Sequence, residues 1–272
     1  MSSYDPKSMA GGLAGELERL EAQADLTWES ELEILNHLGI GSASQILEVG
    51  HGSGAFLSRL SARLPGAHLT GVEPEQSLYD ISTGQHALRT SNVTLINQDL
   101  SEFSKENPSS FDFVLARMVF QHLTNPDQAA LEIYNLLKPN GTVAVIDVDG
   151  GLWGIASPMD YRLGLIQQKA WESQGQRGGN RFIGRSLTKI LVDAGLCEVR
   201  LDLAVADSTT LGIDNFVPLI DPVNLVPLVE SGVLSLDDYK LAVTGFKKFM
   251  ENRNSIVQTV NFVASGRRRL AK

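Results

Sequence analysis

The stretch Gln45–Phe56, QILEVGHGSGAF, constrains the fold more than any other part of the chain. Its first residues are apolar and largely β-branched, which predicts a buried strand. Glycines follow at positions 50, 52 and 54, and apolar residues return with helical spacing from Phe56. A strand, a glycine turn and a helix start form a cradle for a nucleotide-like ligand. Glycine lets the backbone approach closely, and a helix N-terminus offers free N–H groups.

The glycine spacing leaves two kinds of ligand open. Gly50, Gly52 and Ala55 also fit the dinucleotide fingerprint G-x-G-x-x-G/A. Glu48 separates the two interpretations, because a carboxylate at the end of the strand would repel an anionic pyrophosphate. The same carboxylate suits the sulfonium and ammonium groups of S-adenosylmethionine. A plain strand, turn and helix without a ligand is the alternative.

Strands and helices alternate regularly after this turn, which predicts parallel βαβ units. Further strands are expected at residues 67–72, 93–96, 111–116, 142–148 and 255–264. The second strand ends at Glu73, where a carboxylate can accept from both ribose hydroxyls, and Asp99 follows the third, placed to accept from an adenine amino group. Each acid could instead be a helix cap or a surface residue. We expect them to converge with Glu48, because ligands bind beyond the carboxyl ends of the strands in open α/β sheets.

The segment E-V-G-x-G-x-G resembles the first motif of class I S-adenosylmethionine-dependent methyltransferases. FDFVLARMVFQHLTNP and LLKPNGTVAVID resemble their fourth and fifth motifs. The resemblance covers residues 45–150, and more loosely 184–203. It implies an α/β fold with a Rossmann-like, seven-stranded, mostly parallel sheet and helices on both faces. The chain departs from the family pattern at His51, at Asn140 and at Ala116-Arg117, and the last departure argues against amide nitrogens of DNA bases or protein glutamine as methyl acceptors.

Segments outside the motifs are expected to cover the substrate. Two amphipathic helices are predicted before Gly39, the first with Leu13 and Ala24 on its apolar face and the second with Trp28 and Leu38. We therefore predict a helical lid over residues 1–40, mobile without ligand as far as residue 30. The cofactor-binding core would occupy 41–150 and continue at 184–206, with substrate caps at 151–183 and 207–254, and the last strand and tail at 255–272.

The resemblance implies a set of site residues. Those expected to bind the cofactor are Glu48, Gly50, His51, Gly52, Gly54, Glu73, Pro74, Asp99, Leu100, Arg117 and Gln121. His122 is the candidate general base, with a pKa near 6–7, and packing against the cofactor wall is its alternative role. Substrate candidates are Tyr4, Trp28, Trp153, Tyr161, Arg162 and Arg181, although Trp28 could equally be a core anchor. No metal site is expected.

Composition narrows the class of partner. The net charge of -9 argues against nucleic-acid binding. Cys197 is the only cysteine, so no internal disulfide can form, a reducing compartment is expected, and a buried structural thiol is predicted. The sequence has no apolar signal core and no transmembrane run, which predicts a cytoplasmic protein without membrane contact.

The functional prediction is therefore an S-adenosylmethionine-dependent methyltransferase. Its acceptor would be an O, N or C nucleophile of a small, natural-product-like or quinone-type molecule. The alternatives are a methyltransferase acting on a peptide or protein, and a non-methylating protein that binds a nucleotide cofactor. The oligomeric state, including a homo-oligomer, is left open.

Overall fold

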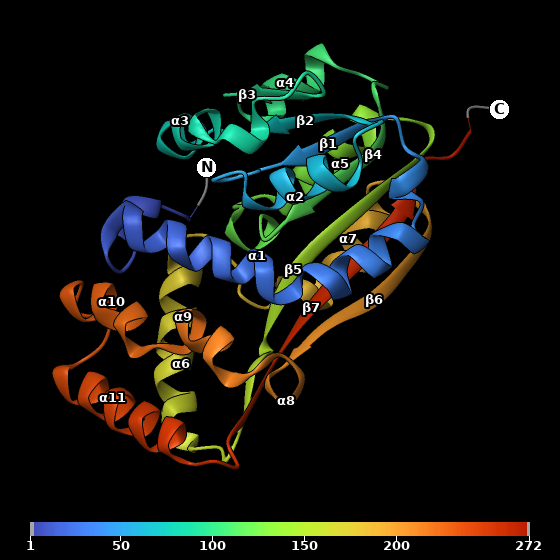
Figure 1. Ribbon diagram of the computed structural model, residues 1–272. Coiled ribbons are helices and arrows are strands. Elements are labelled where there is room, and N and C mark those ends of the chain that lie inside the picture. Colours follow the sequence, from blue (N-terminus) through green and yellow to red (C-terminus); the bar gives the residue numbers. More distant parts are fainter. Residues whose placement is uncertain (1–2, 271–272) are drawn as a thin grey trace.

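One central sheet organises the molecule (Figure 1). The computed structural model describes residues 3–270, apart from the side chain of Trp153. Over these residues the strands form a seven-stranded sheet in the order β3-β2-β1-β4-β5-β7-β6. The strands are β1 Gln45–Val49, β2 His68–Val72, β3 Val93–Ile96, β4 Phe111–Arg117, β5 Leu137–Ser157, β6 Cys197–Asp207 and β7 Ile256–Arg267. Pairings among β1 to β5 are parallel and β7 runs antiparallel to its neighbours, which confirms the mostly parallel Rossmann-like fold.

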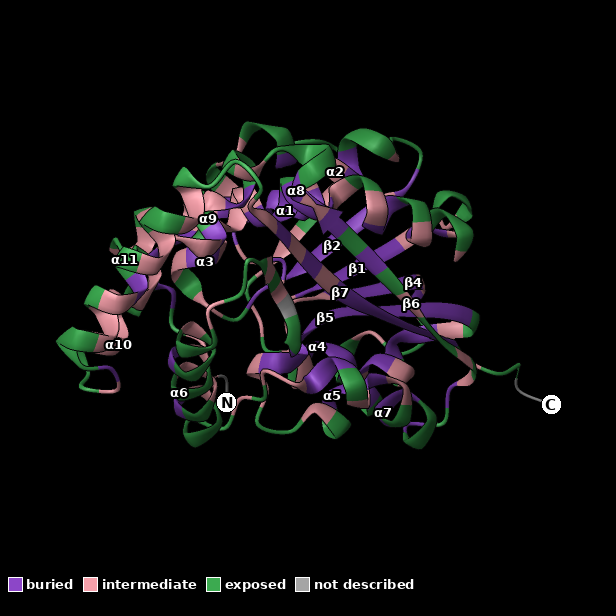
Figure 2. Ribbon diagram, turned by 90° about the horizontal axis from the view of Figure 1, so that it is seen from below, coloured by how far each residue is buried: buried purple, intermediate pink, exposed green. Residues whose placement is uncertain are grey.

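Helices cover both faces of this sheet (Figure 2). They are α1 Gly12–His37, α2 Ala55–Arg63, α3 Gln76–Gly84, α4 Leu100–Glu106, α5 Pro126–Leu136, α6 Tyr161–Gln176, α7 Leu187–Asp193, α8 Ser208–Leu211, α9 Val217–Ile220, α10 Val226–Glu230 and α11 Leu236–Glu251. Local chemistry sets several starts. Asn125 caps α5 ahead of Pro126, and Ser235 and Asp238 form a capping box on α11.

The N-terminal region is one helix, so the prediction of two successive helices was wrong. Between Ala24 and Trp28 the chain holds no glycine or proline, and α1 continues without a break. It ends as predicted before Gly39, whose φ of 92° is left-handed. Ala24, Leu32 and Leu35 are buried, so the second half of α1 is part of the core.

Strand β5 is longer than predicted. It was expected to span 142–148 but continues to Ser157, with irregular register around Val148 and Trp153, because β7 pairs with it along almost its whole length. The paired strands extend past the other strands and lead into α6 and back from α11. The segment expected to form a substrate cap, residues 151–183, therefore begins as strand.

A separate group of helices lies beyond the ends of β1 and β4. Helices α6, α9, α10 and α11 gather there, at the lower left of Figure 1. Ile166, Leu234 and Ala242 form a small core of their own, distinct from the clusters on the two sheet faces. The predicted division of the chain into core, lid and caps stays a prediction, although these helices are placed as a cap would be.

Two composition-based predictions meet the structure differently. Cys197 begins the edge strand β6 and is half-buried, so the prediction of a buried thiol was wrong; its Sγ donates to the carbonyl of Arg267 at 3.2 Å. Within residues 3–270, none of the helices combines the length and apolar character needed to cross a membrane.

Candidate functional site

The glycine turn joins β1 to α2 at the centre of the sheet. Gly50 and Gly52 have φ angles of 65° and 56°, which residues other than glycine rarely adopt. A Cβ at Gly50 would lie 2.7 Å from a methyl group of Val119, whereas a Cβ at Gly52 would meet nothing within 4 Å. The turn therefore presents bare backbone to open space at Gly52.

Glu48 lies just before this turn and is 2% exposed. Its Oε2 atom has no hydrogen-bond partner in the described part of the chain. Burial raises the pKa of Glu48 to about 8; the charge of Arg117 opposes that rise, and the carboxylates of Glu31 and Glu73 add to it. A buried carboxyl with an unsatisfied oxygen is costly, so it marks a place where a cationic or donor group would be stabilised.

Glu73 faces the same turn from the end of β2. Its Oε2 accepts from the Gly52 N–H at 2.9 Å and its Oε1 accepts from the Glu75 N–H at 2.8 Å. Burial raises the pKa of Glu73, and these two backbone hydrogen bonds oppose the rise. Each oxygen retains a lone pair, so the carboxylate can accept from two further donors.

Asp99, after β3, is exposed and caps α4 by accepting from the Ser101 N–H at 2.8 Å. This is the helix-cap role that the sequence left open. The side chain also lines the same cavity as Glu48 and Glu73, so the three acidic strand ends converge as predicted. Pro74 and Leu100 line it beside them.

The cavity has a volume of about 1230 Å³. It extends from the glycine turn to the cap, where Ile166 of α6, Leu219 of α9 and Phe249 of α11 line it. One end is thus backbone and carboxylate, and the other is mostly apolar. This volume exceeds the usual range for one drug-sized ligand, so two ligands can lie side by side in it.

Two predicted residues support the turn in other ways. His51 lines the cavity but is 5% exposed, and neither of its ring nitrogens has a hydrogen-bond partner among the described residues. Burial lowers the pKa of His51 to about 4. Its ring fits because Gly71 of β2 lacks a Cβ, which would lie 2.6 Å from the ring. Gly54 does not line the cavity; it packs on Leu88.

His122 lies in the short turn after β4. The Ser3 N–H donates to its carbonyl at 2.8 Å, and the ring centroids of Tyr4 and His122 are 5.0 Å apart. Burial and then the charges of Arg181, Arg19 and Arg177 lower the pKa of His122 to about 3. The predicted pKa near 6–7 was therefore wrong, because a sequence does not reveal which charges a fold brings to a ring.

Gln121, next to His122, is buried and lines the cavity. Its Oε1 accepts from Arg181 Nη1 at 2.5 Å, and its backbone N–H donates to Asp147 Oδ2 at 3.0 Å. Burial raises the pKa of Asp147 to about 6. The position of Gln121 is thus set from both the cap side and the sheet side.

Comparison with known proteins agrees with this arrangement. Residues 47–143 match the family model described as a methyltransferase domain. Over this span the chain is similar to methyltransferase domains. The matched span contains the glycine turn, the three acidic strand ends and His122.

Relatives of the methyltransferase domain match only in part. The ubiquinone biosynthesis O-methyltransferase of Albidiferax ferrireducens is 32% identical over 114 residues, which are 41% of this chain and 44% of that protein. An uncharacterized methyltransferase of Schizosaccharomyces pombe is 30% identical over 167 residues, 57% of each chain. The chain therefore spans about half the length of these curated relatives.

The fold extends beyond the matched span. The structure of Haemonchus contortus phosphoethanolamine N-methyltransferase 2 in complex with S-adenosyl-L-methionine is similar, with a TM-score of 0.55 over 90% of this chain and 53% of that one. At 19% identity this likeness concerns the fold alone.

Three of the predicted substrate contacts of the methyltransferase domain do line the cavity. They are Tyr4, Tyr161 and Arg181. Tyr4 donates its hydroxyl to Glu16 Oε1 at 2.6 Å, and its burial, with the charge of Glu16, raises its pKa. Tyr161 is 73% exposed, so only part of it faces inward.

Two further predicted substrate residues do not line the cavity in the described part of the chain. Trp28 is absent from the cavity lining over residues 3–270 and packs against Phe56, with ring centroids 5.1 Å apart, so it is a core anchor. Arg162 is likewise absent from that lining; it points to solvent and pairs with Asp160 at 2.6 Å. The side chain of Trp153 lies outside the described part of the structure.

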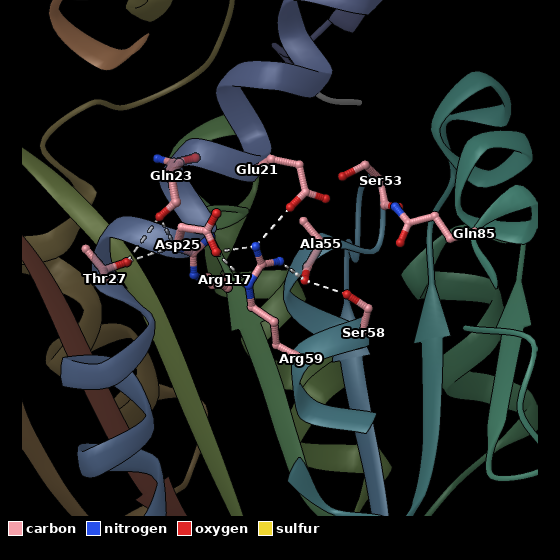
Figure 3. A network of polar contacts seen from close by, with 10 residues as sticks. All are labelled: Glu21, Gln23, Asp25, Thr27, Ser53, Ala55, Ser58, Arg59, Gln85 and Arg117. Atoms are coloured by element: carbon pink, nitrogen blue, oxygen red, sulfur yellow. Dashed lines mark hydrogen bonds and ion pairs between the residues drawn. The ribbon is translucent and has the colours of Figure 1, made fainter. Parts of the chain in front are cut away.

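Arg117 lines the cavity, but its guanidinium is engaged by α1. Its Nε donates to Glu31 at 2.7 Å, and its Nη2 donates to Thr27 Oγ1 and to the carbonyl of Gln23 (Figure 3). The prediction that Arg117 binds a cofactor does not fit these bonds, which make it a brace between β4 and α1.

Three charged residues near His122 were missed by sequence reasoning. Glu16 and Arg19 lie on one face of α1 and pair at 2.6 Å, and Arg177 follows α6. The Glu16 side chain is only 1% exposed, so the carboxylate that pairs with Arg19 is fixed in place. The spacing of Glu16 and Arg19, three residues apart on a helix, was a signal that the sequence contained. The sequence contained no such signal for Arg177, because the position of its side chain depends on how the cap folds back.

Proposed function

We propose that this protein is an S-adenosylmethionine-dependent methyltransferase that acts on a small-molecule acceptor. When bound, the cofactor supplies a methyl group made electrophilic by its sulfonium. The observation that carries the proposal is the buried Glu48 carboxyl, which lines the cavity beside the glycine turn with Oε2 unsatisfied. A cationic ligand would stabilise its ionised form, whereas a pyrophosphate would be repelled.

The other acidic strand ends support the same ligand. Glu73 retains lone pairs for a ribose diol, and the Gly52 N–H holds that carboxylate in place. Asp99 and Leu100 border the next part of the cavity. A base such as adenine would lie there between the hydrogen-bond-accepting carboxylate of Asp99 and the apolar side chain of Leu100. Gly52 leaves the space that such a ligand needs, because a Cβ there would project into the open cavity.

The cap supports a small or medium acceptor. Apolar side chains from α6, α9 and α11 line the far end of the cavity, so an acceptor would be enclosed rather than laid across a groove. The walls would orient the nucleophile in line with the methyl group and exclude water. An O, N or C nucleophile fits equally. We infer a reducing, cytoplasmic setting from the single cysteine.

Titration calorimetry of the purified chain with S-adenosylmethionine, S-adenosylhomocysteine and NAD tests the cofactor. We expect binding of the first two and none of NAD. Glu73→Ala should weaken binding by about 1.5–3 kcal/mol, since a charged acceptor is removed. Gly52→Val should abolish binding, because a branched side chain would enter the cavity at a strained φ.

Glu102→Gln, an exposed carboxylate on α4, is the matched control and should bind as the wild type does. Binding of NAD, or unchanged affinity in both site variants, would refute the cofactor assignment. Methyl transfer from labelled cofactor to a panel of small phenols, amines and acids then separates an enzyme from a non-methylating scaffold. Transfer to peptides but not to small molecules would favour the peptide methyltransferase.

A further inference from the structure

Guanidinium groups surround the part of the cavity next to His122. Arg19 approaches from α1, and Arg177 and Arg181 approach from the segment after α6. Arg19 is balanced, because its Nε and Nη2 donate to the Glu16 carboxylate at 2.7 and 2.6 Å. Arg177 forms no ion pair with any residue in the described range, and its Nη1 donates to the neutral Ser173 Oγ at 2.8 Å. Arg177 therefore adds a positive charge to the lining of the cavity.

The segment that bears Arg177 and Arg181 is held against the end of β4. Gln174 Nε2 and the Asn180 N–H both donate to the Gln121 carbonyl, at 3.0 and 2.8 Å. Between them, a Cβ at Gly179 would lie 2.8 Å from that carbonyl, so the backbone lies too close for a side chain. Such a firmly held segment fixes where its two arginines can point, which favours recognition over a loose charged surface.

A carboxylate on the sheet side, that of Asp147, offsets part of the charge of Arg181 from outside the cavity lining. Asp147 is fully buried and is not part of the cavity lining among residues 3–270. Its two oxygens already accept the backbone N–H groups of Gln121 at 3.0 Å and Val148 at 2.8 Å. The positive charge of the arginines also acts on His122. Burial and the charges of Arg181, Arg19 and Arg177 all oppose protonation of its ring.

Large apolar side chains also line the cavity on the side of the cap. Side chains of Leu163, Trp171 and Phe246 line it from α6 and α11. A ligand that fits both features has an apolar body and one oxyanion. Guanidinium groups bind carboxylates and phosphates strongly, because their planar N–H donors match those oxygens.

We propose that the acceptor carries a carboxylate or phosphate group, which Arg177 and Arg181 bind beside His122 while its apolar body lies against α6 and α11. This inference rests on the proposed methyltransferase function, because it places the acceptor next to the cofactor site. It adds the chemical class of the acceptor, an amphipathic anion. The oxyanion is a recognition group and takes no part in the transfer itself.

Binding to the protein saturated with S-adenosylhomocysteine tests this class. The probes are phenylbutyrate, phenylbutanamide and phenylbutyl phosphate, which share one apolar body. We expect both anions to bind the wild type at least about tenfold more tightly than the amide. The ratio between the affinities for the two anions identifies which oxyanion the site prefers. Either preference supports the proposal if both anions bind more tightly than the amide.

The variants Arg177→Gln and Arg181→Gln should remove this advantage, each by about three- to tenfold, and amide affinity should stay the same. Arg181→Lys keeps the positive charge and is the variant to use if Arg181→Gln misfolds. Arg162→Gln is the matched control, because it removes a solvent-facing arginine from α6, and it should retain the full preference for anions.

Equal affinity for the amide and the anions in the wild type would overturn the proposal. So would a preference that survives in the double variant Arg177→Gln and Arg181→Gln. S-adenosylhomocysteine affinity, measured first in every variant, separates the two levels of inference. If the wild type does not bind S-adenosylhomocysteine, the proposed function fails; if it binds without discriminating anions, only the acceptor class fails.

Discussion

Arg117 and Glu31 form an ion pair of 2.7 Å that is almost completely shielded from water, with 7% and 0% of their side chains exposed. Glu31 Oε1 also accepts from Thr27 at 2.8 Å and from Asn261 of β7 at 2.7 Å. Because every oxygen is occupied, the pair joins α1 to both β4 and β7 near the cavity wall. Figure 3 shows the second tie, in which Arg59 of α2 reaches Glu21 and Asp25 on α1.

Breaking the buried pair from one side should destabilise the fold strongly. Arg117→Met leaves a carboxylate buried without its cation, and we expect a loss of about 3–5 kcal/mol in the free energy of unfolding. Urea denaturation measures it. Adding Glu31→Leu should recover much of the loss, since no buried charge then remains. Lys189→Gln, which breaks an exposed pair, is the control and should leave the midpoint unchanged. A wild-type midpoint in Arg117→Met would contradict the role of this pair.

Glu48 should make the stability of the free protein depend on pH. Its pKa of about 8 in the fold lies above the value of 4.5 expected in the unfolded chain. The folded state therefore binds the extra proton, and this contribution is fully present below pH 4.5 and lost as the pH rises through about 8. Denaturant unfolding between about pH 5 and pH 9 should show the wild type losing a few kcal/mol more than Glu48→Gln does. Parallel pH profiles for the two proteins would exclude such a shift.

Cofactor affinity should respond to the same carboxyl in the opposite sense. A cationic ligand favours ionised Glu48, so binding of S-adenosylmethionine should release a proton and tighten as the pH approaches about 8. Calorimetry in two buffers of different ionisation enthalpy counts that proton. Glu48→Gln should release none, and Glu102→Gln should behave as the wild type. A wild type that releases no proton would place the cationic part of the ligand elsewhere.

His122 should not impose a pH break near neutrality. With its pKa lowered to about 3, the ring is neutral throughout the working range and is a weak base. Titration of this ring should therefore cause no change in kcat/KM between about pH 5 and pH 8, and His122→Gln should retain most of the rate. A rate loss of about 10²-fold with unchanged cofactor affinity would instead identify His122 as the general base. The proposed oxyanion would partly offset the three arginines, so the ring should titrate higher when acceptor is bound.

The start of the chain should matter for turnover more than for stability. The Ser3 N–H bonds to the His122 carbonyl, and Tyr4 lies over the ring, whereas the core contacts of α1 begin later, at residues such as Ala24. Deleting residues 1–10 should lower turnover at least about tenfold and shift the melting temperature little. A longer deletion, of residues 1–24, would also remove buried Glu16 and Gln23 and so destabilise the fold.

Hydrogen exchange with and without S-adenosylhomocysteine tests the predicted ordering of this segment. Protection of residues 3–11 should rise on binding, while the second half of α1 stays protected in both states. Tyr4→Phe, which removes only the hydroxyl bond to Glu16, serves as a milder variant. Equal protection in both states, or full activity after the deletion, would rule out a lid.

Short-range patterns were enough for much of the fold. The apolar run before Gly50 predicted β1, and the helical spacing of apolar residues from Phe56 predicted α2, because both patterns depend on neighbouring residues. The convergence of Glu48, Glu73 and Asp99 followed as well, since parallel strands must end on one edge. The errors arose where partners are distant. Strand β5 was predicted too short because β7, which pairs with it, is Ile256–Arg267, far along the chain from the end of β5 at Ser157.

The same distinction divides the candidate site. Sequence alone determined the glycine turn, the acids at the strand ends and the family they resemble, because those features reside in contiguous motifs. Tertiary structure alone decided that Trp28 packs in the core, that Arg117 pairs with Glu31, and that Arg19, Arg177 and Arg181 surround His122. Burial and charge at a side chain are sums over everything packed around it, and no local pattern contains that sum.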